Sequence, residues 1–286
     1  MRNSEFVLDD PPLFDHDNTQ LHHMSNVRLQ FPFTSSSDVT NTMLEHLDAS
    51  ILGALEGKSK LPITMTDYSL MHPSPIEINE RLLGFSGVCF RHLMNNLCSY
   101  STGANYLEIG VFKGSTLISS VYGNEAVLNE VHAIDNFSEF VPGDAGTHGT
   151  YPHPKDELQK NMNMFLPNTK DKIQLHEADC FQFDLSKLPK IDIYFYDGEH
   201  SAESQYKAFK YYEPAFADIF IAVIDDWAQG GVRRGTKKAF AEIDYDVIAS
   251  RAIIPGKRPN GASRVDNPCR YWWCGTHLAL LKKRGS

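Results

Sequence analysis

Short apolar runs alternate with amphipathic segments along the chain after residue 104. Seven runs are rich in β-branched and aromatic residues and have the length of strands, while four segments between them have the apolar spacing of helices. This alternation predicts an α/β fold with a largely parallel sheet, covered by helices on both faces, whose ligands bind beyond the carboxyl ends of the strands. No long helix separates the last two runs, so we expect a hairpin there and one antiparallel strand in the sheet. The predicted strands are 106–109, 131–134, 172–176, 191–196, 219–224, 245–253 and 271–281, and the predicted helices lie near 114–122, 155–166, 201–213 and 231–243.

The chain before residue 104 has a different pattern. Residues 1–40 mix Pro, Asp, Asn, His and Ser with little periodicity, which favours an arm or a lid segment. Residues 41–56 carry apolar residues at helical spacing, and Gly57 follows as a stop. A second helix over 75–98 is predicted from Ser74-Pro75-Ile76-Glu77, which supplies an N-cap, a proline at the first helical position and a glutamate three residues after the cap. Amphipathic helices need a surface against which to bury their apolar stripes, and either the open side of a ligand site or a second subunit would serve.

Composition narrows the class of protein. The chain has 286 residues, and its charge sum of 27 − 36 = −9 argues against nucleic acid as the main partner. The longest uninterrupted apolar stretch, 219–224, is far too short to cross a membrane, and the polar N-terminal segment does not resemble a signal peptide. Five scattered cysteines, an odd number, predict reduced thiols. We therefore expect a cytoplasmic protein with neither a membrane nor a nucleic-acid partner.

The turn after the first predicted strand contains Gly110 and Gly114. Glycine permits a tight turn and lets a ligand approach the backbone, and the N-terminus of the following helix favours a negative group. The spacing is G-x-x-x-G, whereas a dinucleotide site has G-x-G-x-x-G. Glu108 precedes the first glycine by two residues, and a carboxylate at the end of a buried strand needs a donor or a cation. This combination favours a cofactor with an ammonium group over a diphosphate.

The stretch from Glu108 to Thr116, E-I-G-V-F-K-G-S-T, resembles the first motif of class I S-adenosylmethionine-dependent methyltransferases, in the variant found in catechol and caffeoyl-CoA O-methyltransferases. The resemblance extends over about 105–245. It implies a Rossmann-like fold, with a seven-stranded, mostly parallel sheet in the order 3-2-1-4-5-7-6, and S-adenosyl-L-methionine as the cofactor. It also implies that Asp135 holds the ribose hydroxyls and that Asp179 lies beside the adenine, although either acid alone could be a turn residue. The residues implied to bind the methionine end are Glu108, Gly110, Phe112 and Thr116, with Gly114 in the same turn.

Three carboxylates follow the fourth and fifth predicted strands. Asp197 ends the fourth, and Asp225 and Asp226 end the fifth, 225 − 197 = 28 residues further on. Adjacent parallel strands lie about 4.8 Å apart, so the three carboxylates should converge at the edge that also carries the glycine-containing turn. Unpaired carboxylates repel one another, and a hard divalent cation such as Mg²⁺ relieves that repulsion. The alternative is that these acids cap helices or form ion pairs with Arg233 and Arg234.

The three acids also resemble the metal site of the catechol-type enzymes and of the macrocin O-methyltransferase-like family, which implies metal-assisted O-methylation. Metal coordination lowers the pKa of a hydroxyl acceptor, and a nearby group must then take its proton. His200, three residues after Asp197, is one candidate base because its ordinary pKa is near 6.5. Glu199 is the rival, because macrocin-like enzymes have an acid at that position.

These features predict an S-adenosylmethionine-dependent, divalent-metal-assisted O-methyltransferase. The expected partners are a small-molecule hydroxyl acceptor (a sugar, a natural product or a phenol) and further copies of the chain in a homodimer or higher homo-oligomer. Residues 1–75 would form an N-terminal arm with a helical lid or dimerisation segment, and residues 76–286 the S-adenosylmethionine-binding domain. Two alternatives stay open: a metal-binding relative with other chemistry, of the cephalosporin-hydroxylase-like kind, and a non-catalytic cofactor-binding scaffold.

Overall fold

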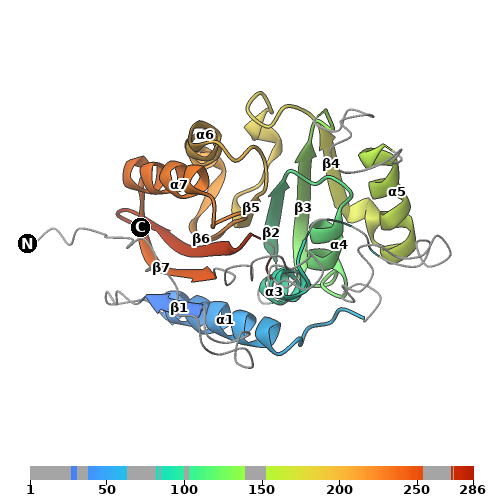
Figure 1. The fold of residues 1–286 in the computed structure, drawn as a ribbon, viewed down its shortest axis with the longest axis horizontal. Helices are drawn as coiled ribbons and strands as arrows, with labels where there is room; N and C mark the ends of the chain where they lie inside the picture. The colour runs from blue at the N-terminus through green and yellow to red at the C-terminus, as the bar shows by residue number, and fades with distance from the viewer. Residues whose placement is uncertain are drawn as a thin grey trace, which may run out of the picture.

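A mixed β-sheet of eight strands runs through the protein, and helices cover both of its faces (Figure 1). The computed structural model describes residues 27–30, 38–62, 82, 84, 86–99, 103–138, 153–253, 272 and 274–286. The strands are β1 (Val27–Gln30), β2 (Ala104–Ile109), β3 (Leu128–Asp135), β4 (Ile173–Glu177), β5 (Ile191–Tyr196), β6 (Phe216–Ile224), β7 (Tyr245–Ile253) and β8 (Thr276–Lys283). The helices are α1 (Asp38–Leu55), α3 (Val88–Cys98), α4 (Ser115–Val121), α5 (Pro154–Phe165), α6 (Ala202–Tyr212) and α7 (Gly230–Glu242).

The strand order is β1-β7-β8-β6-β5-β2-β3-β4. Counted from β2 as the first strand, the seven strands after residue 104 follow the predicted order 3-2-1-4-5-7-6, so the predicted Rossmann-like fold class is confirmed. β8 is antiparallel to both β6 and β7, as the missing helix between the last two strands predicted. β1 adds an eighth strand, which pairs antiparallel with β7 from Val27↔Ile253 to Gln30↔Ser250. It lies within the segment 1–40 that was predicted to be an arm, and a four-residue edge strand is too short to show in the apolar pattern.

Two predicted boundaries are wrong. The helix predicted over 75–98 is not continuous: α3 begins at Val88 after the extended N-cap Gly87, and residues 82, 84 and 86 are not helical, while 75–81, 83 and 85 lie outside the described residues. A side chain at Gly84 would place its Cβ 2.2 Å from the hydroxyl of Ser115, so the chain passes too close to α4 at this point for a larger residue. The last strand begins at Thr276 rather than at residue 271, and Trp272, predicted to lie in it, is in a helical turn.

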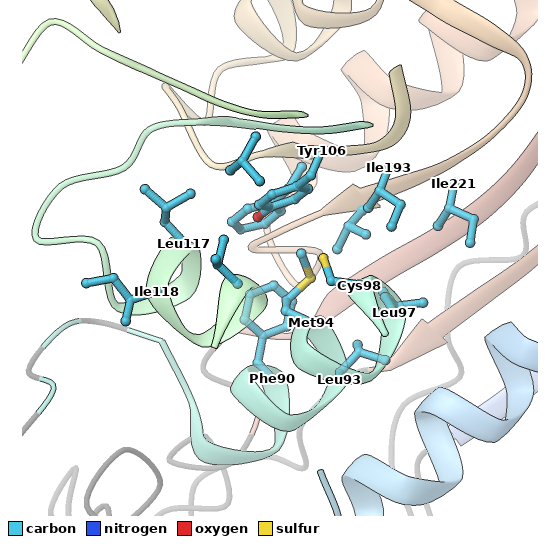
Figure 2. Packing of buried hydrophobic residues seen from close by; sticks show 14 of the residues in the cluster. Phe90, Leu93, Met94, Leu97, Cys98, Tyr106, Leu117, Ile118, Ile193 and Ile221 are labelled. Atoms are coloured by element: carbon cyan, nitrogen blue, oxygen red, sulfur yellow. The ribbon is translucent and has the colours of Figure 1, made fainter. Parts of the chain in front are cut away.

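One face of the sheet packs against α1, α3, α4 and α5 through a largely aliphatic core. In Figure 2, Phe90 and Met94 of α3 and Leu117 of α4 lie between these helices and the strand residues Tyr106 and Ile193. All five side chains are buried. This core holds the N-terminal helices against the middle of the sheet.

The other face packs against α6 and α7 through a core rich in aromatic rings. Phe216 stacks on Phe220 with their ring centroids 4.2 Å apart, and Phe209 meets Phe240 edge-on at 4.9 Å. Offset and edge-on ring pairs of this kind add to the free energy gained from burial. The two helices that follow the strands β5 and β6 are thus fixed firmly beside the ends of those strands.

Helix α1 belongs to the same core as the sheet. Leu47 is fully buried, and Ile51 is 2% exposed. Asp48 accepts two hydrogen bonds from the buried guanidinium of Arg251 on β7, at 2.8 and 3.0 Å. The division of the chain at residue 75 and the lid or dimerisation role of its first part stay predictions. None of the helices that the structure describes combines the length and the apolar character needed to cross a membrane.

Candidate active site

The carboxyl ends of four neighbouring strands bring the predicted site residues to one edge of the sheet. In the ladders of β2, β5 and β6, Ile109 pairs with Tyr196, and Tyr196 pairs with Ile224. β3 lies on the other side of β2, with Ile109 opposite Ile134. The turns that follow these four residues therefore lie side by side, as the predicted topology required.

The glycine turn, residues 110–114, follows β2. Gly110 has φ +85°, and a Cβ there would lie 1.9 Å from the carbonyl oxygen of Asp197, so this glycine lets the turn after β5 pass directly over it. Gly114 also has a positive φ, and its Cβ would lie 2.3 Å from Leu158 of α5. Contacts within the protein thus require glycine at both positions, whether or not a ligand also approaches the backbone there.

Asp135 ties the first two turns of this edge together. Its Oδ2 accepts backbone N–H groups from Val111 at 2.7 Å and Phe112 at 2.8 Å, and its Oδ1 accepts the N–H of Phe137 at 2.7 Å. Phe112 and Phe137 have φ values of 49° and 53°, which non-glycine residues seldom adopt. Strained backbone of this kind gathers at functional sites, where the surroundings hold it in place.

Glu108 lies behind the glycine turn and is only 1% exposed. The hydroxyl of Tyr106 donates to its Oε2 at 2.5 Å. Burial raises the pKa of Glu108 well above its usual range, and the neighbouring carboxylates of Asp197 and Asp135 raise it further. Burial and the neighbouring acids therefore favour the protonated form of this side chain. The sequence marked Glu108 as an acid in need of a donor, and Tyr106 is that donor.

The other residues predicted to bind a cofactor differ in exposure. Thr116 is buried in the first turn of α4, 6% exposed. Asp179 is exposed just after β4, where its carboxylate accepts the N–H of Phe181 at 2.8 Å and the side-chain amide of Gln182 at 2.6 Å. Asp179 is thus a turn residue whose carboxylate also faces solvent.

Asp197, His200 and Asp226 form the acid–histidine cluster, in which one ligand atom from each residue lies within 4.8 Å of the other two. The Nε2 atom of His200 is 2.9 Å from Oδ2 of Asp226 and 3.6 Å from Oδ1 of Asp197. The sequence predicted Asp197, Asp225 and Asp226 as the metal-binding set. The structure instead brings His200 into the group, and Asp225 is not part of it among the described residues.

Two atoms of the cluster lack a hydrogen-bond partner among the described residues: Nε2 of His200 and Oδ1 of Asp226. Nε2 of His200 nevertheless lies 2.9 Å from Oδ2 of Asp226, within ion-pair distance. Buried polar atoms without partners are costly and uncommon in folded proteins. The two atoms make this cluster a candidate ligand site.

The charges of the cluster are strongly coupled. The carboxylates of Asp197 and Asp226 raise the pKa of His200 to about 10, against the opposing effect of burial. Burial, with Asp197 and Asp226 nearby, raises the pKa of Asp225 well above its usual range. In this arrangement His200 is an imidazolium at neutral pH and has no lone pair with which to accept a proton.

Glu199, the rival candidate for a base, is not among the three residues of the cluster. It is exposed, and its Oε2 accepts the hydroxyl of Ser201, the N-cap of α6, at 3.0 Å. Glu199 is thus free to accept a proton but stands outside the group of three.

The loop after β6 holds Asp226 in place. Asp226 has φ 53°, and the next residue, Trp227, donates its N–H to the carbonyl of Gly275 at 3.1 Å. The ring of Trp227 stacks on His277 of β8 with centroids 4.0 Å apart. Arg233 donates to the carbonyl of Trp227 at 2.8 Å rather than to an acid of the cluster. The alternative in which the acids serve only as partners of this arginine therefore loses its basis.

Two glycines of α7 place the His200 segment. A Cβ at Gly231 would lie 2.7 Å from the carbonyl oxygen of His200, and one at Gly235 would lie 2.4 Å from that of Ala202. The helix α7 can therefore lie directly against the start of α6. The sequence analysis missed the parts played by Tyr106 and His277 and by these glycines, because each depends on contacts between distant segments.

Residues 107–227 match a family model that is described as a methyltransferase domain. The match runs from β2 to the residue after Asp226, so it contains both the glycine turn and the acid–histidine cluster. A comparison of the sequence with curated proteins finds no match.

Solved methyltransferase structures resemble the fold. The methyltransferase PaMTH1 of Podospora anserina, solved with bound SAH, has a TM-score of 0.53 and 10% identity, covering 89% of this chain and 100% of that one. The O-methyltransferase TomG of Streptomyces achromogenes, involved in tomaymycin synthesis, has a TM-score of 0.49 and 14% identity, covering 78% of this chain and 91% of that one. An O-methyltransferase of Bacillus cereus in complex with SAH has a TM-score of 0.46 and 13% identity, covering 87% and 92%. At such identities, the likeness to PaMTH1 establishes the fold and not the reaction.

Proposed function

We propose that the methyltransferase domain of this protein transfers a methyl group from S-adenosylmethionine to a hydroxyl oxygen of a small molecule, with the help of a divalent cation. The observation that carries the proposal is the position of the acid–histidine cluster. It lies at the same sheet edge as the glycine turn and inside the segment 107–227 that matches the methyltransferase domain. A cofactor on the glycine turn and an acceptor at the cluster would then be neighbours, and holding two reactants side by side is a large part of such catalysis.

The cofactor would lie along the ends of β2, β3 and β4. Asp135 is proposed to hold the ribose hydroxyls: a carboxylate has about four lone-pair sites, and backbone N–H groups take three of them here. Asp179 is proposed to lie beside the adenine, with its exposed carboxylate free on the solvent side. Gly110, Phe112 and Thr116 would line the methionine end, with Gly114 in the same turn. Glu108 is proposed to support this end from behind, through its contacts with Tyr106 of the strand and with the backbone of Leu117 in α4.

The acid–histidine cluster has the chemistry of a cation site. It offers two carboxylates and one imidazole, and the unpartnered Oδ1 of Asp226 and Nε2 of His200 are the kinds of atom that bind divalent ions. A cation bound there would lower the pKa of an acceptor hydroxyl. Asp197 and Asp226 would hold it, and the loop pinned by Trp227 would keep Asp226 in place.

The proton of the acceptor hydroxyl needs a base. His200 has no lone pair for this proton: Nε2 holds a proton of its own in the metal-free protein, where its pKa is about 10, and would hold the cation in the loaded one. Glu199 is exposed and next in the chain, so we propose Glu199 as the group that takes the proton. Replacing Glu199 by Gln should then lower kcat and leave KM for the cofactor unchanged.

Calorimetry with S-adenosylmethionine tests the cofactor half of the proposal. We expect one molecule to bind per chain, and we expect Asp179→Asn to weaken that binding by roughly tenfold, the effect of one lost charged hydrogen bond. Asp184→Asn is the matched control, because Asp184 is also an exposed acid that caps a turn after β4. It should leave the affinity unchanged. Absence of binding would refute the proposal, and binding without methylation of any hydroxyl compound would favour the scaffold or a different chemistry.

A further inference from the structure

We propose that the acid–histidine cluster binds a divalent first-row transition metal, with His200 as a ligand beside Asp197 and Asp226, in preference to Mg²⁺. The inference deepens the proposed function and rests on it for the purpose of the metal. The metal binding itself can be measured separately from methyl transfer. The proposed ligand set has one nitrogen and two carboxylate ligands, whereas the set that the sequence predicted has three carboxylates.

The spacing of the three ligand atoms suits a single metal ion. Ligands about 2.1 Å from a metal lie about 3.0 Å apart when adjacent in an octahedral site and about 3.4 Å apart in a tetrahedral one. The observed separations from Nε2 of His200 are 2.9 Å to Asp226 and 3.6 Å to Asp197. An ion placed among the three atoms would need only small side-chain shifts to reach them all.

Burial and the unpartnered atoms favour a ligand at this place. Asp226 is 5% exposed, and its Oδ1 has no hydrogen-bond partner among the described residues. Nε2 of His200 also has no hydrogen-bond partner among the described residues, although it lies within 3.6 Å of a carboxylate oxygen of each acid. A metal ion would replace the proton on Nε2, which is released to solvent, and would then bind the imidazole nitrogen and the carboxylates together.

The far side of the imidazole ring already has a neighbour. The side-chain amide of Gln229 lies 3.4 Å from Nδ1 of His200. Histidines that bind metals usually donate their other ring N–H to an acceptor, which fixes the tautomer. An amide presents its oxygen or its nitrogen after a half-turn, so Gln229 can accept the Nδ1–H while Nε2 faces the metal.

The ligand chemistry decides the class of metal. Mg²⁺ and Ca²⁺ prefer oxygen ligands, whereas imidazole suits the later first-row ions. Asp225 would have completed an oxygen-only set, but the backbone N–H of Asp226 donates to its carboxylate, and Asp225 stands outside the group of three. The position next to it, Asp226, has a left-handed backbone that turns its side chain toward His200 instead.

The first test is direct binding to the full chain after treatment with a chelator. Calorimetric titrations with Co²⁺, Mn²⁺ and Mg²⁺ should give one site per chain, with Co²⁺ bound roughly tenfold or more tightly than Mg²⁺. His200→Asn should weaken Co²⁺ binding by roughly a hundredfold and change Mg²⁺ binding far less, since even outer-shell changes cost about 10–100-fold. His153→Asn is the control for adventitious binding to histidine: His153 caps α5, away from the cluster, and Asn can keep that cap.

The second test identifies the nitrogen ligand without any assay of activity. Pulsed electron paramagnetic resonance of the Mn²⁺-loaded protein should show coupling to one imidazole nitrogen. The coupling should vanish in His200→Asn and persist in His153→Asn. Circular dichroism of each variant shows whether it is folded, so that a lost signal is not mistaken for a lost ligand.

Three results would overturn the inference: tighter binding of Mg²⁺ than of Co²⁺, equal Co²⁺ affinities for the wild type and His200→Asn, or no bound cation at all. The last result would mean that the protonated imidazole of His200 is itself the permanent counter-ion of the acids. Measuring S-adenosylmethionine binding to the chelator-treated protein distinguishes a failure of the metal inference from a failure of the proposed function. If the cofactor binds and the metal does not, only the metal inference fails. If the metal binds and the cofactor does not, the methyltransferase proposal fails instead.

Discussion

The turns after β2 and β3 and the turns after β5 and β6 lie at the same edge of the sheet, yet their acids are satisfied in opposite ways. Asp135, after β3, accepts three backbone N–H groups and so completes the protein's own structure. Asp226, after β6, has a buried oxygen without a hydrogen-bond partner among the described residues, as does the imidazole of His200 beside it. The protein itself satisfies the acid of the first pair of turns, whereas the second pair leaves two buried polar atoms without a hydrogen-bond partner among the described residues.

The difference follows from the donors within reach. The glycine turn presents successive backbone N–H groups toward β3, so an acid at the end of β3 is bound by backbone alone. The turns after β5 and β6 present acids to each other, with the side chain of His200 as the nearest cation. On the proposed function, an acid of the first kind shapes the binding surface and has one lone pair left for the cofactor, whereas the acids of the second kind have their oxygens available for a cation.

The largest effect should come from Asp226→Asn. The change keeps the shape of the side chain, and Asn tolerates the left-handed backbone of this position better than most residues. It removes one ligand charge from the cluster, so we expect kcat to fall by about a thousandfold or more, while S-adenosylmethionine affinity stays within about threefold. Steady-state kinetics and calorimetry measure the two quantities. Asp218→Asn, at an exposed acid of the same strand, is the control and should change neither.

Asp135→Ala should lower the stability of the protein and its affinity for the cofactor, the two properties least affected by Asp226→Asn. Three backbone donors lose their acceptor, and we expect the free energy of unfolding to fall by roughly 2–4 kcal/mol. Cofactor affinity should fall with it, because the glycine turn is no longer tied to β3. Urea denaturation measures the loss. An unchanged stability would show that water replaces the carboxylate at no cost and that the two pairs of turns do not differ as described.

A smaller effect should appear in the pH dependence of the metal-free protein. The pKa of His200 is raised to about 10 in the folded state, above its ordinary value near 6.5. The folded protein therefore holds a proton that the unfolded chain releases, so the stabilisation is complete below about pH 6.5 and declines as the pH rises toward 10. Melting temperatures of the wild type and His200→Asn, measured with a chelator present, should differ most at the acid end and converge near pH 10. A difference that grows with pH would contradict the sign of this coupling.

The smallest effect should come from His277→Phe. Both ring nitrogens of His277 are buried without partners among the described residues, and burial lowers its pKa to about 3. Phenylalanine keeps a ring under Trp227, so we expect a rise of about 1 kcal/mol or less in the free energy of unfolding, with kcat within about twofold. Loss of activity at unchanged stability would show instead that His277 has a chemical part in the reaction.

Much of the fold could be predicted from the sequence because its strands are buried on both sides and read as apolar runs. β5 and β7 have the predicted limits. The sequence did not predict the start of α3, because it depends on the close contact of Gly84 with Ser115 and on Gly87 as the N-cap. It did not predict β1 either, because four residues are too few to show an alternating pattern.

The sequence predicted that the acids after β5 and β6 converge at one edge of the sheet, but it could not predict which of them lies beside His200. Asp225 and Asp226 are equivalent in the sequence, and the backbone φ of Asp226 decides which of them meets His200. Asp135 likewise reads as an exposed turn acid until the glycine turn is folded against it. The contacts of Asp226 and of Asp135 each depend on the packing of two turns against one another, which the sequence of either turn alone does not show.

One titration tests the contrast between the two pairs of turns most directly. Chelator-treated protein is titrated with S-adenosylmethionine, and Co²⁺ is then added to the same cell. The account predicts one cofactor bound per chain before any metal is present, followed by one Co²⁺ per chain, because the cofactor side is complete and the acid–histidine cluster is not. Cofactor binding that appears only after Co²⁺ is added, or a cluster that takes up no cation, would contradict it.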